Sequence, residues 1–249
     1  MKNSYLFAAA IILVLTACGG GGGGGGGSST NVPIEGVWTG TTSNNYTINL
    51  LVLENNEVWN MFGTTSGNNL LVSGFDQGSG SVNGSSVNGS LKEFLNGSAP
   101  YAVTIAGTAV AGTSIKGSLA YSGGSGTFSV APIPVSSFNY DQAAKISDVQ
   151  GTWTGLMLNG RSAIVTIGPT GTLSGSNNGC LFNGTATPRS SGKNVLNISV
   201  SFGAAPCALP GQTMTGIALS YKTITNQTQL IIAAVDASKS NGTAFLALR

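Results

Sequence analysis

The side chains of this 249-residue chain that could carry chemistry are three cysteines and eight carboxylates, because histidine is absent. Without histidine there is no Ser-His-Asp or Cys-His site and no imidazole ligand for a metal. Catalysis by carboxylates needs two acids a few ångströms apart with separated pKa values. Glu54 and Glu57 flank two asparagines and are expected to bracket a solvated hairpin turn. The other acids considered stand singly in the sequence: Asp76, Asp141, Asp148 and Asp236. We therefore predict a protein that is not an enzyme, with no catalytic residues, no metal and no cofactor.

The N-terminal residues carry the pattern of an export signal. Lys2 supplies a positive charge, and residues 5–15 form an apolar run that is shorter than the roughly 20 residues that span a bilayer. The motif Leu15-Thr16-Ala17-Cys18 follows, and it resembles the lipobox of bacterial lipoproteins. The resemblance implies that residues 1–17 are a cleaved signal peptide. It also implies a diacylglyceryl group on the Cys18 thiol and a fatty acid such as palmitate on the new amine.

Acylation of Cys18 would anchor the protein to a membrane. Each buried methylene contributes about 0.8 kcal/mol, so several acyl chains hold a protein durably where one does not. The sorting rule of the family retains lipoproteins at the inner membrane when Asp follows the Cys, and Gly19 stands there instead. The resemblance thus implies the outer membrane. The alternatives are a plain secretory signal with a chance Cys, or an uncleaved anchor.

A flexible tether is predicted for residues 18–33. Gly19 to Gly27 are nine consecutive glycines, which have no side chains to bury and cannot form an element of a folded domain. Together with Ser28, Ser29 and Thr30 they make twelve residues, which give a root-mean-square reach of roughly 19 Å. A phosphate-binding loop would need a Gly-Lys-Ser/Thr motif, which is missing here. The tether resembles that of surface lipoproteins of Gram-negative pathogens, such as transferrin-binding and factor-H-binding lipoproteins, although it would serve a periplasmic domain equally well.

Two cysteines remain once Cys18 is acylated. Cys180 and Cys207 form an even pair in an exported chain, and the cell envelope is oxidising, so we predict a disulfide between them. The closed loop would stabilise the fold by roughly 3 kcal/mol. A zinc site or a nucleophile would need partners that the sequence does not supply.

An internal repeat organises the rest of the chain. Gly36-Val37-Trp38-Thr39-Gly40 recurs as Gly151-Thr152-Trp153-Thr154-Gly155, at an offset of 153 − 38 = 115. We expect one repeat over residues 34–130, a linker with a short helix over 131–148, and a second repeat over 149–249. The helical turn is expected at residues 140–146.

Both repeats have the two-residue period of half-buried strands. In residues 195–202, for example, Leu196, Ile198, Val200 and Phe202 share one face. The second repeat predicts eight strands, near residues 151–158, 162–168, 171–176, 179–187, 194–202, 212–221, 228–236 and 241–248. Turn pairs are expected at Asn83-Gly84, Asn88-Gly89, Asn159-Gly160 and Asn183-Gly184. Eight antiparallel strands with short turns close most economically as an up-and-down barrel. The first repeat is irregular between residues 74 and 100, which leaves its strand count open.

A Gly-x-Trp motif at the start of an eight-stranded meander resembles the lipocalin and avidin superfamily. The resemblance implies two tandem β-barrels in an all-β protein, with Trp38 and Trp153 packed across the closed ends. It also implies that Arg249 lies over Trp153. In avidins an Asn that binds biotin follows the Trp, but Gly155 stands at that position, so the resemblance implies no biotin site.

The formal charge of +2 is small and scattered, which excludes a nucleic-acid partner. We expect a non-enzymatic outer-membrane lipoprotein, bound to the membrane through Cys18, that acts as a binding or surface-interaction module. The alternative is a periplasmic carrier of a small hydrophobic ligand, and a carboxylate-dependent envelope hydrolase has the least support. Filled barrels would favour a protein partner on the outer surface, whereas open barrels would favour cargo.

Overall fold

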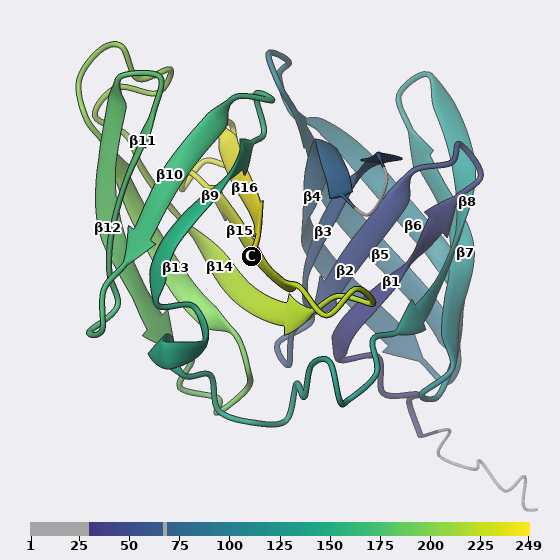
Figure 1. Ribbon diagram of the computed structural model, residues 1–249. Helices are drawn as coiled ribbons and strands as arrows, with labels where there is room; N and C mark the ends of the chain where they lie inside the picture. The colour runs from purple at the N-terminus through teal and green to yellow at the C-terminus, as the bar shows by residue number, and fades with distance from the viewer. Residues whose placement is uncertain (1–29, 67–68) are drawn as a thin grey trace, which may run out of the picture.

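Two closed antiparallel β-barrels of eight strands each make up the fold, which confirms the predicted fold class (Figure 1). The computed structural model describes residues 30–66 and 69–249. The predicted signal peptide, Cys18 and most of the predicted tether lie outside the described residues. No helix in the described part of the chain is long and apolar enough to cross a membrane.

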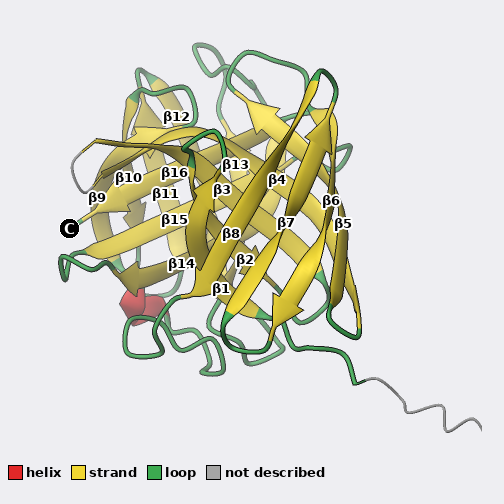
Figure 2. Ribbon diagram, turned by 90° about the vertical axis from the view of Figure 1, so that its right-hand side faces the viewer, coloured by secondary structure: helices red, strands yellow, loops and turns green. Residues whose placement is uncertain are grey.

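Each barrel is an uninterrupted meander in which every strand pairs with its neighbours in sequence and the last strand pairs with the first (Figure 2). The first barrel contains β1 (Gly36–Thr42), β2 (Thr47–Val52), β3 (Glu57–Ser66), β4 (Asn69–Asn83), β5 (Ser86–Leu95), β6 (Tyr101–Val110), β7 (Ser114–Tyr121) and β8 (Gly124–Pro132). The second contains β9 (Gly151–Met157), β10 (Ser162–Ile167), β11 (Thr172–Asn177), β12 (Cys180–Pro188), β13 (Leu196–Phe202), β14 (Thr213–Lys222), β15 (Thr228–Val235) and β16 (Gly242–Leu248).

The region from residue 74 to 100 is regular after all, since it holds most of β4 and all of β5. The turn predicted at Asn83-Gly84 exists, with Asn83 as the last residue of β4 and Gly84 and Ser85 as the turn residues, and Asn159-Gly160 lies in the turn between β9 and β10. The turns predicted at Asn88-Gly89 and Asn183-Gly184 are wrong, because both pairs lie inside strands. A Cβ on Gly184 would stand 1.9 Å from the Ser199 carbonyl oxygen, so this glycine permits close strand approach rather than a turn.

The segment between the barrels contains one short helix, a 3₁₀ turn η1 (Ile146–Asp148). The helical turn predicted at residues 140–146 therefore overlaps the observed one at Ile146 alone. Residues 140–144 are held instead by tertiary contacts. The Tyr140 ring is buried in the core between the barrels, and the Asn194 N–H donates to the Tyr140 carbonyl at 2.9 Å.

Buried apolar side chains line the interiors of both barrels. The first interior is built from buried residues including Trp38, Ile48, Leu50, Val58, Phe62, Val87, Leu91, Val103, Ile115, Phe128 and Val130. The second is built from residues including Trp153, Val165, Ile167, Leu173, Phe182, Leu196, Ile198, Val200, Leu230, Ile232 and Phe245. A void found within the second interior measures only about 20 Å³, smaller than the pockets that hold drug-sized ligands.

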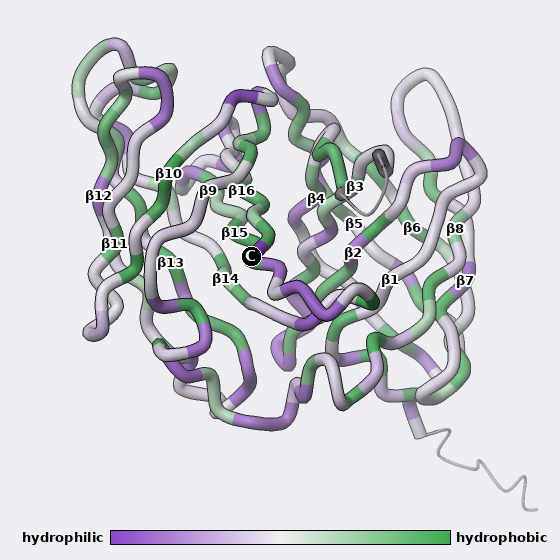
Figure 3. The backbone as a smooth tube through the Cα atoms, in the orientation of Figure 1, coloured by the Kyte–Doolittle hydropathy of each residue, from purple (hydrophilic) through white to green (hydrophobic). Residues whose placement is uncertain are grey.

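A third apolar core joins the two barrels. The outer faces of β2, β3 and β4 pack against the outer faces of β14, β15 and β16, and these elements face each other in Figures 1 and 3. The buried side chains of this core include Leu51, Trp59, Met61, Phe75, Phe94, Ile217, Leu219, Ile231, Ala233 and Leu246. Strand β15 is consequently buried on both faces from Gln229 to Val235.

Polar contacts flank this apolar core. Glu54 and Glu57 do bracket the turn between β2 and β3, but Glu54 is not the solvated side chain that the sequence predicted. Its carboxylate accepts hydrogen bonds from Arg189 at 2.9 Å and from the Tyr140 hydroxyl at 2.8 Å. Burial acts to raise the pKa of Glu54, but these and its backbone hydrogen bonds outweigh it and hold the pKa at about 2. The Tyr221 hydroxyl also crosses the interface and donates to Asn49 Oδ1 at 2.9 Å.

Candidate functional site

The two repeated tryptophans lie in equivalent positions at one end of each barrel. Trp38 and Trp153 are 3% and 1% exposed. Each indole N–H donates to the carbonyl four residues earlier, to Ile34 at 2.9 Å and to Val149 at 2.7 Å. The glycine two residues before each tryptophan has a φ of +120° or +110°, a conformation that favours glycine. The entry segment thus turns sharply and lies across the end of its barrel.

Arg249 lies over one of these indoles. Its guanidinium carbon is 3.7 Å from the centre of the Trp153 ring, and Nη1 donates to the Gln150 carbonyl at 3.0 Å. Gly155, which replaces the avidin asparagine, lies against β16. A Cβ there would stand 2.2 Å from the Leu246 carbonyl oxygen, so no larger residue fits without displacing the strand.

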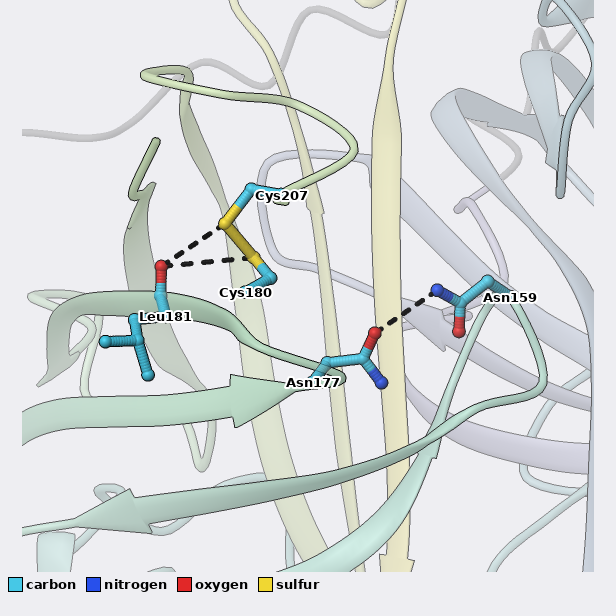
Figure 4. The surroundings of a disulfide bond; sticks show 5 residues. All are labelled: Asn159, Asn177, Cys180, Leu181 and Cys207. Carbon is cyan, nitrogen blue, oxygen red and sulfur yellow. Dashed lines mark hydrogen bonds between the residues drawn. A yellow bond between two sulfur atoms is a disulfide. The ribbon is translucent and has the colours of Figure 1, made fainter. Parts of the chain in front are cut away.

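The predicted disulfide between Cys180 and Cys207 is confirmed (Figure 4). It joins the start of β12 to the long loop between β13 and β14, with a Cα–Cα distance of 4.4 Å. The two sulfurs lie 3.9 Å and 3.4 Å from the Leu181 carbonyl oxygen. Beside the disulfide, Asn159 Nδ2 donates to Asn177 Oδ1 at 3.4 Å and so links two neighbouring turns. The disulfide adds a covalent restraint to a loop that also has backbone hydrogen bonds, such as that from the Gly203 N–H to the Leu181 carbonyl at 2.8 Å.

This loop borders a groove of about 760 Å³ between the barrels. The groove is lined by segments 94–100 of the first barrel and 157–161, 177–180, 202–209 and 240–243 of the second. All five segments belong to turns at the ends of the barrels opposite Trp38 and Trp153. Arg161 is the only charged residue that lines the groove within the described chain, and the rest of the lining mixes Asn, Ser and Gly with apolar residues such as Met157 and Phe202.

A second cleft of about 500 Å³ lies where β3 and β4 approach the outer face of β12 to β14. Its charged side chains are Glu57, Arg189, Asp236 and Lys239. Gln77 lines the cleft and is 4% exposed, and its Nε2 donates to Glu57 at 3.1 Å. The cleft mixes both signs of charge and shows no cluster of one ligand type.

The most unusual polar group lies inside the first barrel. Asn60, Asp76, Glu93 and Tyr101 are register partners across β3, β4, β5 and β6 and form one transverse row. Val58 and Phe62 of β3 belong to the apolar core of the first barrel. Asn60 lies between them at the same two-residue spacing, so its side chain, and with it the row, faces the barrel interior. Asp76 stands singly in the sequence, but the fold brings Glu93, a carboxyl that is distant in sequence, to lie beside it.

Hydrogen bonds connect the members of this row. Asn60 Nδ2 donates to Asp76 Oδ2 at 2.8 Å, and the Tyr101 hydroxyl donates to Glu93 Oε1. Asp76 is 6% exposed, and its Oδ1, like Asn60 Oδ1, is buried with no hydrogen-bond partner among the described residues. Asn60 Oδ1 therefore lacks a donor, which is costly in a low-dielectric interior, whereas a protonated Asp76 can donate to Glu93.

The two carboxyls share an environment that disfavours negative charge. Burial and the charge of Glu93 raise the pKa of Asp76 well above its ordinary value. Burial likewise raises the pKa of Glu93, although hydrogen bonds from Tyr101 and Asp76 act to lower it. The pair therefore retains one proton near neutral pH, and it titrates as a unit.

Sequence reasoning missed Asn60, Glu93 and Tyr101. The signal that could have found Glu93 is the alternation Leu91-x-Glu93-x-Leu95, which places an acid at an inward position of a strand. That inference requires a strand at 86–95, which the Gly-rich sequence before it obscures. Within the described residues no group of three or more His, Cys, Asp or Glu side chains has the arrangement of a metal site.

Comparisons with known proteins assign no family. No protein-family model matches the chain, and no curated protein matches it. A similar solved structure is that of a protein of unknown function from the DUF3598 family of Nostoc punctiforme PCC 73102. That protein is 15% identical, the match covers 86% of this chain and 95% of the other, and the TM-score is 0.27. At this level of similarity the match carries no argument about function.

Proposed function

We propose that the protein is a non-enzymatic lipoprotein of the bacterial outer membrane, anchored through acylated Cys18, that binds a protein partner in the groove between its two barrels. The observation that carries this proposal is the groove of about 760 Å³. Turns from both barrels line it, so it exists only because the barrels are docked on each other.

The position of the groove supports display away from the membrane. The chain enters the first barrel at the end that Trp38 closes, where the Val32 N–H donates to the Gly84 carbonyl at 2.8 Å. The turns that line the groove lie at the opposite end of both barrels, where they can be followed in Figure 1. A tether that starts at an anchored Cys18 would therefore present the groove outward, at the full length of the barrels from the lipid.

The filled interior of the second barrel argues against the alternative of a hydrophobic carrier. Carriers of drug-sized ligands use cavities of about 300–1,000 Å³ lined mainly by apolar residues. The void in the second interior, bordered by residues such as Phe182 and Phe245, measures about 20 Å³. The groove outside has the required size, but its lining mixes polar turn residues with apolar ones, which suits a protein interface better than a mainly apolar ligand pocket.

Site-specific photo-crosslinking in living cells tests the groove. A photoreactive amino acid is placed at Ser98 or Ala208, exposed positions that line the groove from different barrels, and at Ser118, an exposed control on the outer face of β7. We expect the same crosslinked partner from both groove positions and not from the control. Equal crosslinking from all three positions, or none from either groove position, would refute the groove as the binding surface.

Membrane anchoring and display are tested separately. A Cys18→Ala variant should accumulate unprocessed and without acyl chains, which mass spectrometry of the purified chain detects. Protease treatment of intact cells should degrade the wild-type protein if it is displayed on the surface. Protection in intact cells together with degradation in cells with a permeabilised outer membrane would place it on the periplasmic face.

A further inference from the structure

The polar row inside the first barrel has the composition of a cation site. Asp76 and Glu93 are adjacent register partners, and both face an interior that is otherwise apolar. Two carboxyls in such an environment cannot both be ionised unless a positive charge lies between them. That charge is supplied by a proton or by a bound cation.

Unpartnered acceptors distinguish this row from an ordinary pair of acids. Asp76 Oδ1 and Asn60 Oδ1 are buried and accept no hydrogen bond from the described residues. The carboxylate of Glu93 is the third acceptor of the row, and one of its oxygens accepts from Tyr101. Three acceptors from three side chains match the three N–H donors of a primary ammonium group.

The residues around the row exclude water from one side and leave it accessible from the other. Phe62 and Leu95 occupy the space beside Gly74, since a Cβ there would lie 2.5 Å and 2.6 Å from their side chains, and they cover Asp76 on that side. Glu93 and Tyr101 are only half-buried. The path to the carboxyls therefore runs along Tyr101, whose ring centre is 6.4 Å from that of Tyr121.

We propose that Asp76 and Glu93 bind the primary ammonium group of a small organic amine. The organic body of the amine lies against the rings of Tyr101 and Tyr121, which offer it an apolar and aromatic contact surface. This inference does not depend on the proposed function, because it concerns the interior of one barrel rather than the groove between the two.

Binding exchanges one positive charge for another. The ammonium enters with its charge, and the proton that the carboxyl pair holds is released to solvent. Both carboxyls then act as carboxylates that accept N–H hydrogen bonds, and Asn60 Oδ1 accepts the third. No covalent bond forms or breaks apart from the O–H bond of the released proton.

Isothermal titration calorimetry on the full-length chain tests the proposal with three probes of one shape. Phenethylamine carries the ammonium group, 2-phenylethanol is its neutral counterpart, and N,N,N-trimethylphenethylammonium keeps the charge but has no N–H donor. We expect saturable binding of phenethylamine alone at millimolar concentration. Titrations in buffers of different ionisation enthalpy should show release of about one proton per amine at neutral pH.

Substitutions locate the binding event. Asp76→Asn and Glu93→Gln keep the size of each side chain but leave one carboxylate instead of two to face the bound ammonium, so each should weaken phenethylamine binding by at least about tenfold. Asp148→Asn, which changes an exposed carboxyl in η1, is the matched control and should leave binding unchanged. Circular dichroism and thermal melts establish that each variant is folded.

Three results would overturn the proposal. The first is no saturable heat from phenethylamine with the folded wild-type protein. The second is equal affinity in the wild type and in both barrel variants, which would place the amine elsewhere. The third is binding without proton release or equal binding of 2-phenylethanol, either of which would mean that the carboxyl pair does not receive the ammonium.

Discussion

Replacing Asp76 by Asn should stabilise the protein at neutral pH and leave its stability at acidic pH almost unchanged. The ordinary pKa of the carboxyl is 3.8, and burial together with Glu93 raises it to about 8 in the folded protein. Between these values the unfolded chain has released its proton while the folded chain still holds it. The unfolded state therefore gains relative stability as the pH rises through this window.

The size of the effect follows from the same shift. Each pH unit between the two pKa values costs the folded state about 1.4 kcal/mol, so the loss between pH 4 and pH 7 reaches up to about 4 kcal/mol. The amide of Asp76→Asn does not titrate. It can still accept the hydrogen bond from Asn60, now 2.8 Å long, and it can donate to Glu93. The variant should thus escape most of this loss, which corresponds to a melting temperature higher by about 10 °C at pH 7.

Denaturant unfolding of the wild type and the variant at several values of pH between 4 and 8 measures this difference. The two free energies of unfolding should agree near pH 4 and diverge steadily as the pH rises. Asp148→Asn, at an exposed site, should follow the wild type throughout. Parallel curves for the wild type and Asp76→Asn would refute the reasoning, because they would mean that Asp76 has the same pKa in the folded and unfolded chains.

Three further predictions concern stability. The double variant Cys180→Ser/Cys207→Ser opens a loop of 27 residues and should lose roughly 3 kcal/mol of unfolding free energy, measured against the wild type with and without reductant. Arg249→Ala removes the guanidinium from the buried indole beneath it and should cost about 1 kcal/mol in the same assay. Ile217→Asn places an amide in the core between the barrels, where the isoleucine is 2% exposed, and should cost about 3 kcal/mol. Ile224→Asn, at a fully exposed position, is its control and should change stability by less than about 0.5 kcal/mol. Equal effects of the two isoleucine variants would contradict the assignment of the interface.

The second barrel was predictable from sequence because its strands obey a simple alternation. In β13, Leu196, Ile198 and Val200 face inward while the residues between them face solvent or a neighbour. The first barrel lacks this pattern in β4, whose inward positions include Gly74 and Gly78. Large side chains from neighbouring strands fill the space that these glycines leave. A strand whose inward positions are glycines has the sequence of a loop when that segment is read without its neighbours.

The candidate cation site was beyond prediction for the same reason. Asp76 and Glu93 are 17 positions apart, and only the register of β4 against β5 makes them neighbours. Register depends on where a turn lies, and the Gly-rich segment offered two turn signals, of which only Asn83-Gly84 is a turn. A one-residue error would have moved either acid to the outer face. Local periodicity thus predicts which strands exist but not which polar residues they bring together.

The docking of the barrels has a sequence signature that differs from alternation. A strand with one solvated face alternates, whereas a strand covered on both faces is apolar without interruption. Residues 230–235 of β15 are Leu-Ile-Ile-Ala-Ala-Val and all are buried, with alternate members in the barrel interior and in the core between the barrels. The barrel interior covers only the inner face of a strand. A strand that is apolar on both faces must therefore have its outer face covered by another body. The uninterrupted run therefore implies that the two repeats are not independent modules on a string. They form one unit, and the groove that we propose as the binding surface is a consequence of that docking.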